Sequence, residues 1–217
     1  RASLFLSPLA LLLLLAPAES FPALHLPAAT ARLRGGVGST VSMSKCNFGP
    51  ISTRDEIVFG AHRPGFLPNE ENEKPGAVDD ALVADWCTFV QSQGVKRILS
   101  FLEPNELEWY KSPLETQLAA AGFDVKDKYV NAPLSLDDAA KKAMKAFDDA
   151  NAAGEKIVIH CSGGIGRTGL MGALYLTQKY GLSAEDAVKE VCEQAEKIGV
   201  ARATKPEKVV KLIESLK

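Results

Sequence analysis

Residues 160–169, with the sequence HCSGGIGRTG, combine a nucleophile with groups that bind anions. Cys161 supplies a thiol whose ionised form is a strong nucleophile. Arg167 supplies a planar guanidinium that fits two oxygens of a phosphate. Three glycines between them let the chain curl, in part through positive φ angles, so that successive backbone N–H groups point inward. The segment therefore predicts an anion-binding cup built around a cysteine.

The residues on either side of this segment predict the elements that hold it. The apolar run Ile157–Ile159 precedes it and is typical of a buried strand. An amphipathic stretch begins at Thr168 and is typical of a helix. A helix N-terminus at this point adds its partial positive charge and free N–H groups to the cup, which favours a bound anion and the thiolate form of Cys161.

The segment resembles the signature loop of the cysteine-dependent protein tyrosine and dual-specificity phosphatases, H-C-x-x-G-x-x-R-[ST]-G. The fixed positions of that pattern are occupied by His160, Cys161, Gly164, Arg167, Thr168 and Gly169. The alternative is a buried structural cysteine followed by a helix-capping glycine turn. That alternative does not explain why a cysteine, an arginine and three glycines converge at one strand-to-helix junction. The length of residues 43–217 is closer to the dual-specificity enzymes than to the larger tyrosine-specific domains.

The resemblance implies hydrolysis of phosphomonoesters without a metal or another cofactor. Cys161 would attack phosphorus and form a cysteinyl-phosphate, while Arg167 and the loop amides hold the three equatorial oxygens. Thr168 would donate a hydrogen bond to the sulfur as it leaves, and His160 would orient the cysteine backbone from outside the pocket. The positions expected to bind phosphate are Ser162, Gly163, Gly164, Ile165, Gly166 and Arg167.

Enzymes of this family also use a general acid, usually an aspartate between the preceding strand and helix. Residues 131–138 (NAPLSLDD) occupy that place, but they form a shorter stretch than the usual acid loop. Asp137 is the first candidate, and Asp138 is the second because it can also complete an S-x-x-D capping box. Both carboxylates can equally serve only to stabilise a helix N-terminus. Asp124 and Asp127 are poorer candidates, since they fall within a predicted strand.

The loop also bears on the substrate. Ser162, Gly163 and Ile165 place no Lys or extra Arg in it. Phosphoinositide phosphatases of the family that this loop resembles often place basic residues there to bind several phosphates, so we expect a phosphorylated protein or peptide as substrate. Three alternatives stay open: a phosphate-binding adaptor with weak or no turnover, a plastid phosphoglucan phosphatase, and a rhodanese-like sulfur transferase.

Length and composition limit the possible classes of protein. A chain of 217 residues with 46% hydrophobic and 24% charged residues provides one substantial domain. The net charge of −2 gives no support for nucleic-acid or anionic-membrane binding. We expect a monomer with no membrane partner in its mature form.

The four cysteines show no C-x-x-C spacing, which argues against zinc and against a disulfide framework. The family resemblance leaves open a reversible disulfide between Cys161 and either Cys87 or Cys192. The simpler expectation is that both are small buried apolar residues.

Residues 1–42 differ in kind from the rest of the chain. Leu9–Ala16 is an apolar run followed by small residues, as in a secretory signal peptide. Phe21 follows the expected cleavage site, and residues 21–42 contain no Asp or Glu. Together these features resemble the two-part presequences of algae with secondary plastids. We therefore expect plastid import; secretion, a disordered leader, or a cytoplasmic location if the leader does not function are the alternatives.

Periodicity in residues 43–217, the expected catalytic domain, predicts an α/β fold. A central, mostly parallel sheet would be flanked by helices, with a C-terminal helical cluster and the signature loop at the carboxyl edge of the sheet. The expected strands are 57–60, 95–102, 123–130 and 156–160. The expected helices are 78–93, 112–121, 135–151, 169–180, 183–197 and 205–216. Arg63, Glu103 and Arg202 could rim the site, although solvation at the surface is the simpler expectation for each.

Overall fold

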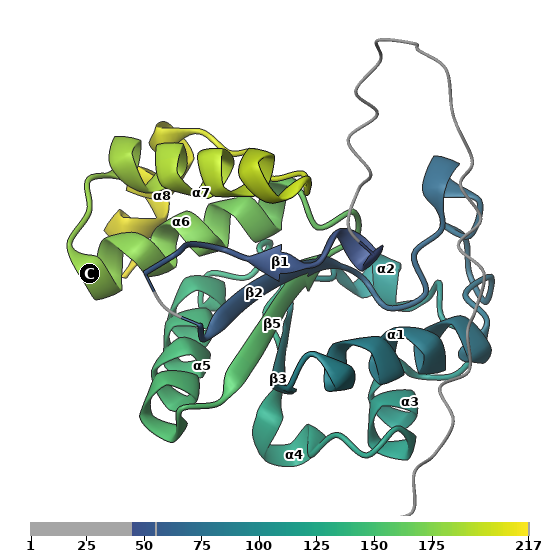
Figure 1. Cartoon of the computed structure of the whole chain (residues 1–217). Coiled ribbons are helices and arrows are strands. Elements are labelled where there is room, and N and C mark those ends of the chain that lie inside the picture. Colours follow the sequence, from purple (N-terminus) through teal and green to yellow (C-terminus); the bar gives the residue numbers. More distant parts are fainter. Residues whose placement is uncertain (1–44, 55, 217) are drawn as a thin grey trace, which may run out of the picture. The chain divides into compact units, whose positions relative to one another are not determined.

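The computed structural model describes residues 45–54 and 56–216 (Figure 1). The two-part presequence predicted for residues 1–42 lies outside the described residues. The signal peptide, the plastid location and the boundary at residue 43 therefore stay predictions.

Short apolar segments form a five-stranded sheet in the order β1-β2-β5-β3-β4. The strands are β1 (Gly49–Pro50), β2 (Val58–His62), β3 (Val95–Ser100), β4 (Tyr129–Asn131) and β5 (Lys156–Cys161). Only β1 pairs antiparallel, with β2; the other pairs are parallel. This confirms the expected mostly parallel sheet, with β5 at its centre.

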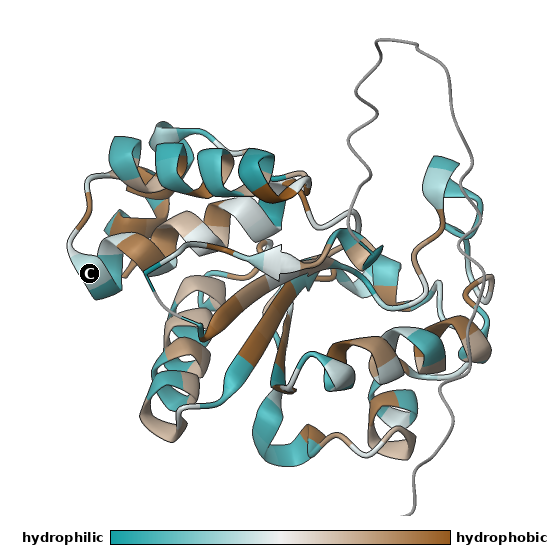
Figure 2. Ribbon diagram, viewed as in Figure 1, coloured by the Kyte–Doolittle hydropathy of each residue, from teal (hydrophilic) through white to brown (hydrophobic). Residues whose placement is uncertain are grey.

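Helices cover both faces of the sheet, and each face has its own apolar core. The first core includes residues of α5 (Ala139–Ala153), α6 (Gly166–Tyr180), α7 (Ala184–Ile198) and α8 (Pro206–Ser215). The second includes residues of α1 (Asp80–Ser92) and α3 (Leu114–Ala120). Figure 1 shows these two groups of helices on opposite sides of the strands, and Figure 2 shows the apolar colour of β2 and β5 between them. The C-terminal helical cluster is also as predicted.

Successive residues of β5 point to opposite faces of the sheet, and this alternation determines the face on which Cys161 lies. Ile157 and Ile159 belong to the core beneath α5 and α6, whereas Val158 belongs to the core beneath α1. Cys161 continues the first set and His160 the second. The strand thus delivers the cysteine to the side on which α6 begins.

The strand predicted for residues 123–130 is wrong over most of its length. Residues 125–128 form a helical turn, α4 (Val125–Lys128), and only Tyr129–Asn131 joins the sheet. Asp124 precedes this turn, and its Oδ1 accepts a hydrogen bond of 3.2 Å from the Asp127 backbone N–H. This cap stabilises the helical turn against the extended conformation.

The capping box predicted at Ser135 does not form either. Helix α5 begins at Ala139, after Asp138, and Asp138 makes no side-chain cap. Ser135 Oγ instead donates to Glu103 Oε2 at 2.5 Å. The Ser135 N–H, which would donate to Asp138 in such a box, also donates to Glu103, to Oε1 at 3.3 Å, so a carboxylate from another segment has replaced the local one.

Helix α6 begins at Gly166, three residues before the predicted start at 169. Arg167 and Thr168 therefore lie in its first turn. Elements that the sequence did not indicate are β1, α2 (Pro104–Leu107), and two short 3-10 helices, η1 (Lys45–Asn47) and η2 (Pro68–Glu70). No helix in the described ranges has the length and apolar character needed to cross a bilayer.

Candidate active site

Cys161 ends β5 at the base of the signature loop and is 4% exposed. Its Sγ accepts a hydrogen bond of 3.3 Å from Thr168 Oγ1, in the first turn of α6. The strand end and the helix start thus hold the two side chains together. A hydroxyl in this position stabilises negative charge on the sulfur.

The loop curls at Gly164, whose φ of 71° is the left-handed conformation that favours glycine. A Cβ at this position would lie 2.3 Å from the Ala61 carbonyl oxygen in β2. The Arg63 N–H also donates to the Ser162 carbonyl at 2.9 Å. The loop is therefore packed directly against the end of β2, where no side chain fits at position 164.

Asn47 and Arg202 bind the outer side of the loop. Asn47 Nδ2 donates to the Gly163 carbonyl at 3.1 Å, and Arg202 Nη1 donates to the Gly164 carbonyl at 2.9 Å. Because the C=O and N–H of a trans peptide point in opposite directions, these bonds turn the corresponding N–H groups away from Asn47 and Arg202. Burial lowers the pKa of Arg202 to about 10, so its guanidinium remains charged at neutral pH.

Arg63, whose N–H bonds the loop at Ser162, is fully buried. Its Nη2 donates to Asn72 Oδ1 at 2.6 Å, and its guanidinium carbon lies 5.0 Å from the centre of the Trp109 ring. Glu73 lies 3.9 Å from the same guanidinium and accepts a hydrogen bond of 2.9 Å from Ser162 Oγ. This network connects Arg63 to the loop.

The expectation of surface solvation was therefore wrong for Arg63 and Arg202, which are 0% and 8% exposed. Both are held by buried amide, carbonyl or carboxylate oxygens that take the place of water. Glu103 is half-buried, and Ser135 is bonded to it.

Arg167 makes a two-pronged ion pair with Glu106 in α2. Arg167 Nη2 donates to Glu106 Oε1 at 2.6 Å, and Nη1 donates to Glu106 Oε2. Nη1 also donates to the Phe101 carbonyl at the end of β3, at 2.8 Å. The hydrogen bonds to Glu106 raise the pKa of Arg167. The guanidinium is thus oriented by both the sheet and α2.

Sequence reasoning did not identify Glu106. Its other role is to cap α2, since its Oε2 accepts a hydrogen bond of 2.8 Å from the Glu103 N–H. Pro104 at the first helical position and a glutamate at the third form a recognisable helix start. That signal could have located α2, although not its contact with Arg167.

A pocket of about 650 Å³ opens over the cysteine. The residues that line it are Leu134, Cys161, Gly163, Ile165, Gly166, Arg167, Leu170, Ala203, Thr204, Lys205 and Lys208. Its wall combines apolar side chains with three cationic ones. Within the described part of the chain, no carboxylate lines it.

The structure brings together Cys161, Arg167 and Thr168, but it does not bring Asp137 to the pocket. Asp137 is exposed in the turn before α5. Asp138 is also exposed and pairs with Lys142 at 2.9 Å, one turn along α5. Among residues 131–138 only Leu134 lines the pocket. Ser162 and Gly164, also expected to bind phosphate, contribute contacts behind the loop and do not line the pocket.

His160 lies outside the pocket, on the α1 side of the sheet. Its ring packs edge-on against Trp86, with 5.7 Å between ring centres, and is completely buried. Neither ring nitrogen makes a hydrogen bond of ordinary geometry to a described residue. Burial lowers the pKa of His160 to about 3, so the ring is neutral at physiological pH. The histidine is therefore an apolar packing element at the base of the loop.

All four cysteines are free thiols in the structure. Cys87 is buried, and burial raises its pKa to about 12, which makes it unreactive. Cys192 is half-buried beside the core under α6 and α7. In the described ranges, no cluster of three or more His, Cys, Asp or Glu side chains could hold a metal ion.

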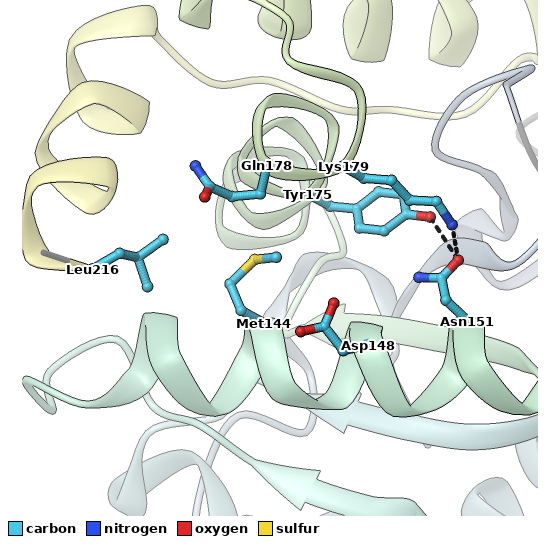
Figure 3. Close-up of a pocket in the computed structure, with 7 residues that line it drawn as sticks. All are labelled: Met144, Asp148, Asn151, Tyr175, Gln178, Lys179 and Leu216. Carbon is cyan, nitrogen blue, oxygen red and sulfur yellow. Dashed lines mark hydrogen bonds between the residues drawn. The ribbon is translucent and has the colours of Figure 1, made fainter.

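A second pocket, of about 510 Å³, lies between α5, α6 and the end of α8 (Figure 3). Asn151 Oδ1 accepts hydrogen bonds there from the Tyr175 hydroxyl, at 3.3 Å, and from Lys179 Nζ. None of the signature-loop residues lines this pocket. It is separate from the cysteine site.

Comparison with known proteins gives the same family as the loop. Residues 105–205 match the family described as dual specificity phosphatase, catalytic domain. Among solved structures, PTPMT1 in complex with PI(5)P is 17% identical, with a TM-score of 0.54, covering 77% of this chain and 93% of that one. Tk-PTP in its active form is 16% identical, with a TM-score of 0.52, covering 78% and 95%.

Kinase associated phosphatase, in a form whose catalytic cysteine is replaced by serine, is 20% identical, with a TM-score of 0.52, covering 72% of this chain and 84% of that one. At these identities the three structures establish the shared fold. The matched domain contains the whole signature loop, from His160 to Gly169. The domain at residues 105–205 is therefore of the dual-specificity phosphatase family, and together with the shared fold it supports a phosphatase activity.

Proposed function

We propose that this phosphatase hydrolyses phosphomonoesters of proteins through a cysteinyl-phosphate formed on Cys161. One observation carries the proposal: Cys161 Sγ, hydrogen-bonded to Thr168 Oγ1, lies in the same pocket as the guanidinium of Arg167. The nucleophile and the phosphate ligand therefore share one cavity, and the buried Thr168 hydroxyl that would support the leaving thiolate contacts the nucleophile directly.

The reaction proceeds in two displacements. In the first, the Cys161 thiolate attacks phosphorus, the ester P–O bond breaks, and the leaving oxygen takes a proton. In the second, water attacks phosphorus, the S–P bond breaks, and phosphate and the thiolate are released. Arg167 and the loop N–H groups bind the equatorial oxygens in both steps, and Thr168 stabilises the departing thiolate.

The leaving oxygen needs a proton in the first step, and the lack of a carboxylic acid among the described pocket residues favours phenolic leaving groups. Asp137 stays the sequence candidate for the donor, but it is exposed and outside the pocket, so water supplies the proton in the arrangement described. A phenolate departs more readily unprotonated than an alkoxide does. We therefore place phosphotyrosine ahead of phosphoserine and phosphothreonine as substrate.

A phosphoinositide is the other substrate to consider, because PTPMT1 was solved with PI(5)P. The signature loop itself has no basic side chain other than Arg167; the other two cations that line the pocket, Lys205 and Lys208, come from the start of α8. Leu134, Ile165 and Leu170 form an apolar wall that suits an aromatic ring. These features favour a phosphoprotein over an inositol ring that carries several phosphates.

The test is turnover of p-nitrophenyl phosphate and of a phosphotyrosine peptide by the purified protein. We expect both activities to disappear in Cys161→Ser and to persist in Cys192→Ser, a matched change at a cysteine outside the pocket. Rapid acid quenching should trap phosphate on the wild-type protein but not on Cys161→Ser. Activity that survives Cys161→Ser would rule out the proposed intermediate.

A second candidate, a phosphate-binding adaptor with little turnover, is favoured by one observation. No carboxylate among the described residues lines the pocket, and Glu106 is already paired with Arg167. In that case the wild-type protein would bind a phosphotyrosine peptide about as tightly as Cys161→Ser does, without releasing phosphate.

We also propose that residues 1–42 direct the protein to a plastid, on the sequence features given above. A fluorescent protein fused behind residues 1–42 should enter the plastid of an alga with a secondary plastid, and a fusion lacking residues 1–20 should not. Secretion of the first fusion would contradict the proposal.

A further inference from the structure

Two lysines stand on one side of the active-site pocket. Lys205 immediately precedes α8, and Lys208 lies in its first turn, where its N–H donates to the Lys205 carbonyl at 3.1 Å. Both line the pocket that contains Cys161, and both are exposed. Neither has an ion pair within 4.0 Å to a described carboxylate.

The charge of these lysines is not balanced within the pocket. Arg167 is already paired with Glu106, and no other carboxylate in the described ranges reaches the wall. The whole chain carries a net charge of −2, so the positive charge at the active-site pocket comes from the residues that line it and not from an excess of basic residues overall. A phosphomonoester bound over Cys161 leaves this additional charge available to a second anion.

The lysines are also held in fixed relation to the signature loop. Arg202 Nη1 bonds the Gly164 carbonyl, and the Ala203 N–H lies 3.4 Å from the Ile165 carbonyl oxygen. A Cβ on Gly169 would lie 3.2 Å from Ala203 backbone atoms, so the chain before α8 is packed closely on α6. The fold therefore sets the backbone position from which Lys205 extends.

From this placement we propose that Lys205 and Lys208 select phosphotyrosine peptides that carry an acidic residue beside the phosphotyrosine. The inference rests on the proposed function and names its substrate class more closely. The phosphate would sit over Cys161, the ring against the apolar wall of Leu134 and Ile165, and the neighbouring carboxylate at the lysines.

The position of the charges favours a peptide as their ligand. Both are exposed and belong to the start of α8, whereas the loop that holds the scissile phosphate has only Arg167. A peptide extends from the pocket along the surface and brings its next side chain to the rim. A compact polyphosphate would place its second charge nearer the floor.

The experiment compares three substrates at low salt: p-nitrophenyl phosphate, a phosphotyrosine peptide with glutamates on both sides, and the same peptide with glutamines. The variants are Lys205→Ala, Lys208→Ala, the double variant, and Lys211→Ala as a control. Lys211 is an exposed lysine of the same helix that does not line the pocket.

We expect the double variant to lower kcat/KM for the glutamate peptide about tenfold, about threefold per lysine, mainly through KM. Turnover of p-nitrophenyl phosphate and of the glutamine peptide should change by less than about twofold, as should every activity of Lys211→Ala. The preference for glutamate should shrink as salt is added, because these charges are exposed.

Each other outcome is decisive. Equal losses on all three substrates would show a structural role for the lysines and overturn the inference, and so would a wild-type enzyme that does not prefer the glutamate peptide. A preference only for soluble inositol bisphosphates would overturn the choice of a peptide. If the wild-type protein turns over no substrate, the proposed function itself has failed, which is a separate result.

Discussion

The signature loop and the turn that follows β4 both border the active site, yet they are held very differently. The loop carbonyls are bound by Asn47 and Arg202, and its Ser162 hydroxyl by Glu73. In the turn, residues 135–138 are exposed, and Ser135 is joined to Glu103. The geometry that binds phosphate is therefore fixed by a buried network, whereas the candidate proton donor stands on a surface turn.

The largest effect is expected from Gly164→Ala, which tests how tightly the loop is packed. Gly164 has a positive φ, and a Cβ added there would lie 2.3 Å from the Ala61 carbonyl oxygen, so a methyl group does not fit. We expect a loss of about 3 kcal/mol in the free energy of unfolding, measured with urea, and loss of vanadate binding. Gly166→Ala is the control, because a Cβ there meets no atom within 4 Å. Equal effects of the two changes would show that the loop is not packed as described.

A pH-dependent effect of intermediate size is expected from His160, which lies buried at the base of the loop. Its folded pKa of about 3 is below the unfolded value of about 6.5. The unfolded state therefore takes up the proton first, so the stabilising difference is complete above about pH 6.5 and declines as the pH falls toward 3. Each such group contributes at most about 1.4 kcal/mol per pH unit.

The measurement is urea unfolding between pH 4.5 and 7 for the wild type and for His160→Asn. We expect the stability of the variant to depend less steeply on pH, whatever its absolute value. His62, whose pKa burial also lowers, contributes a slope of the same sign, so His62→Asn provides the comparison. An unchanged slope in His160→Asn would mean that the histidine is not buried in its neutral form.

A smaller effect is expected from Glu106→Gln, which removes the charge opposite Arg167. The amide can still accept one hydrogen bond, but it no longer orients both guanidinium nitrogens. We expect kcat/KM for p-nitrophenyl phosphate to fall about tenfold, with Glu108→Gln, an exposed neighbour in the same region, unchanged. Equal activities in these two variants would indicate that the Phe101 carbonyl alone positions Arg167.

The same contrast explains what could be predicted from the sequence. The cup, its strand and its helix follow from one continuous segment, in which apolar periodicity, glycines and the cysteine–arginine spacing are all local. The support of the cup is not local. Asn47 and Arg63 come from the region around β1 and β2, whereas Arg202 lies between α7 and α8.

Charged residues of that kind look like solvated surface residues until the fold supplies their partners. The capping box predicted for the turn before α5 was wrong for the opposite reason. A local capping pattern is present in the sequence, but the Ser135 hydroxyl donates its hydrogen bond to Glu103, which is distant in sequence. Side chains whose partners are distant were thus the ones that the sequence could not place.

The smallest effect is expected at Asp137, in the exposed turn after β4. A large effect there would contradict the contrast between this turn and the buried signature loop. Because Asp137 is exposed and does not line the pocket, Asp137→Asn should lower kcat by less than about threefold on p-nitrophenyl phosphate and on a phosphoserine peptide. Asp138→Asn, whose carboxylate is paired with Lys142, is the matched change in the same turn. A loss above about 100-fold confined to Asp137→Asn and to the phosphoserine peptide would identify Asp137 as the general acid. The turn would then have to close over the substrate during the reaction, and its loose attachment would be part of the mechanism.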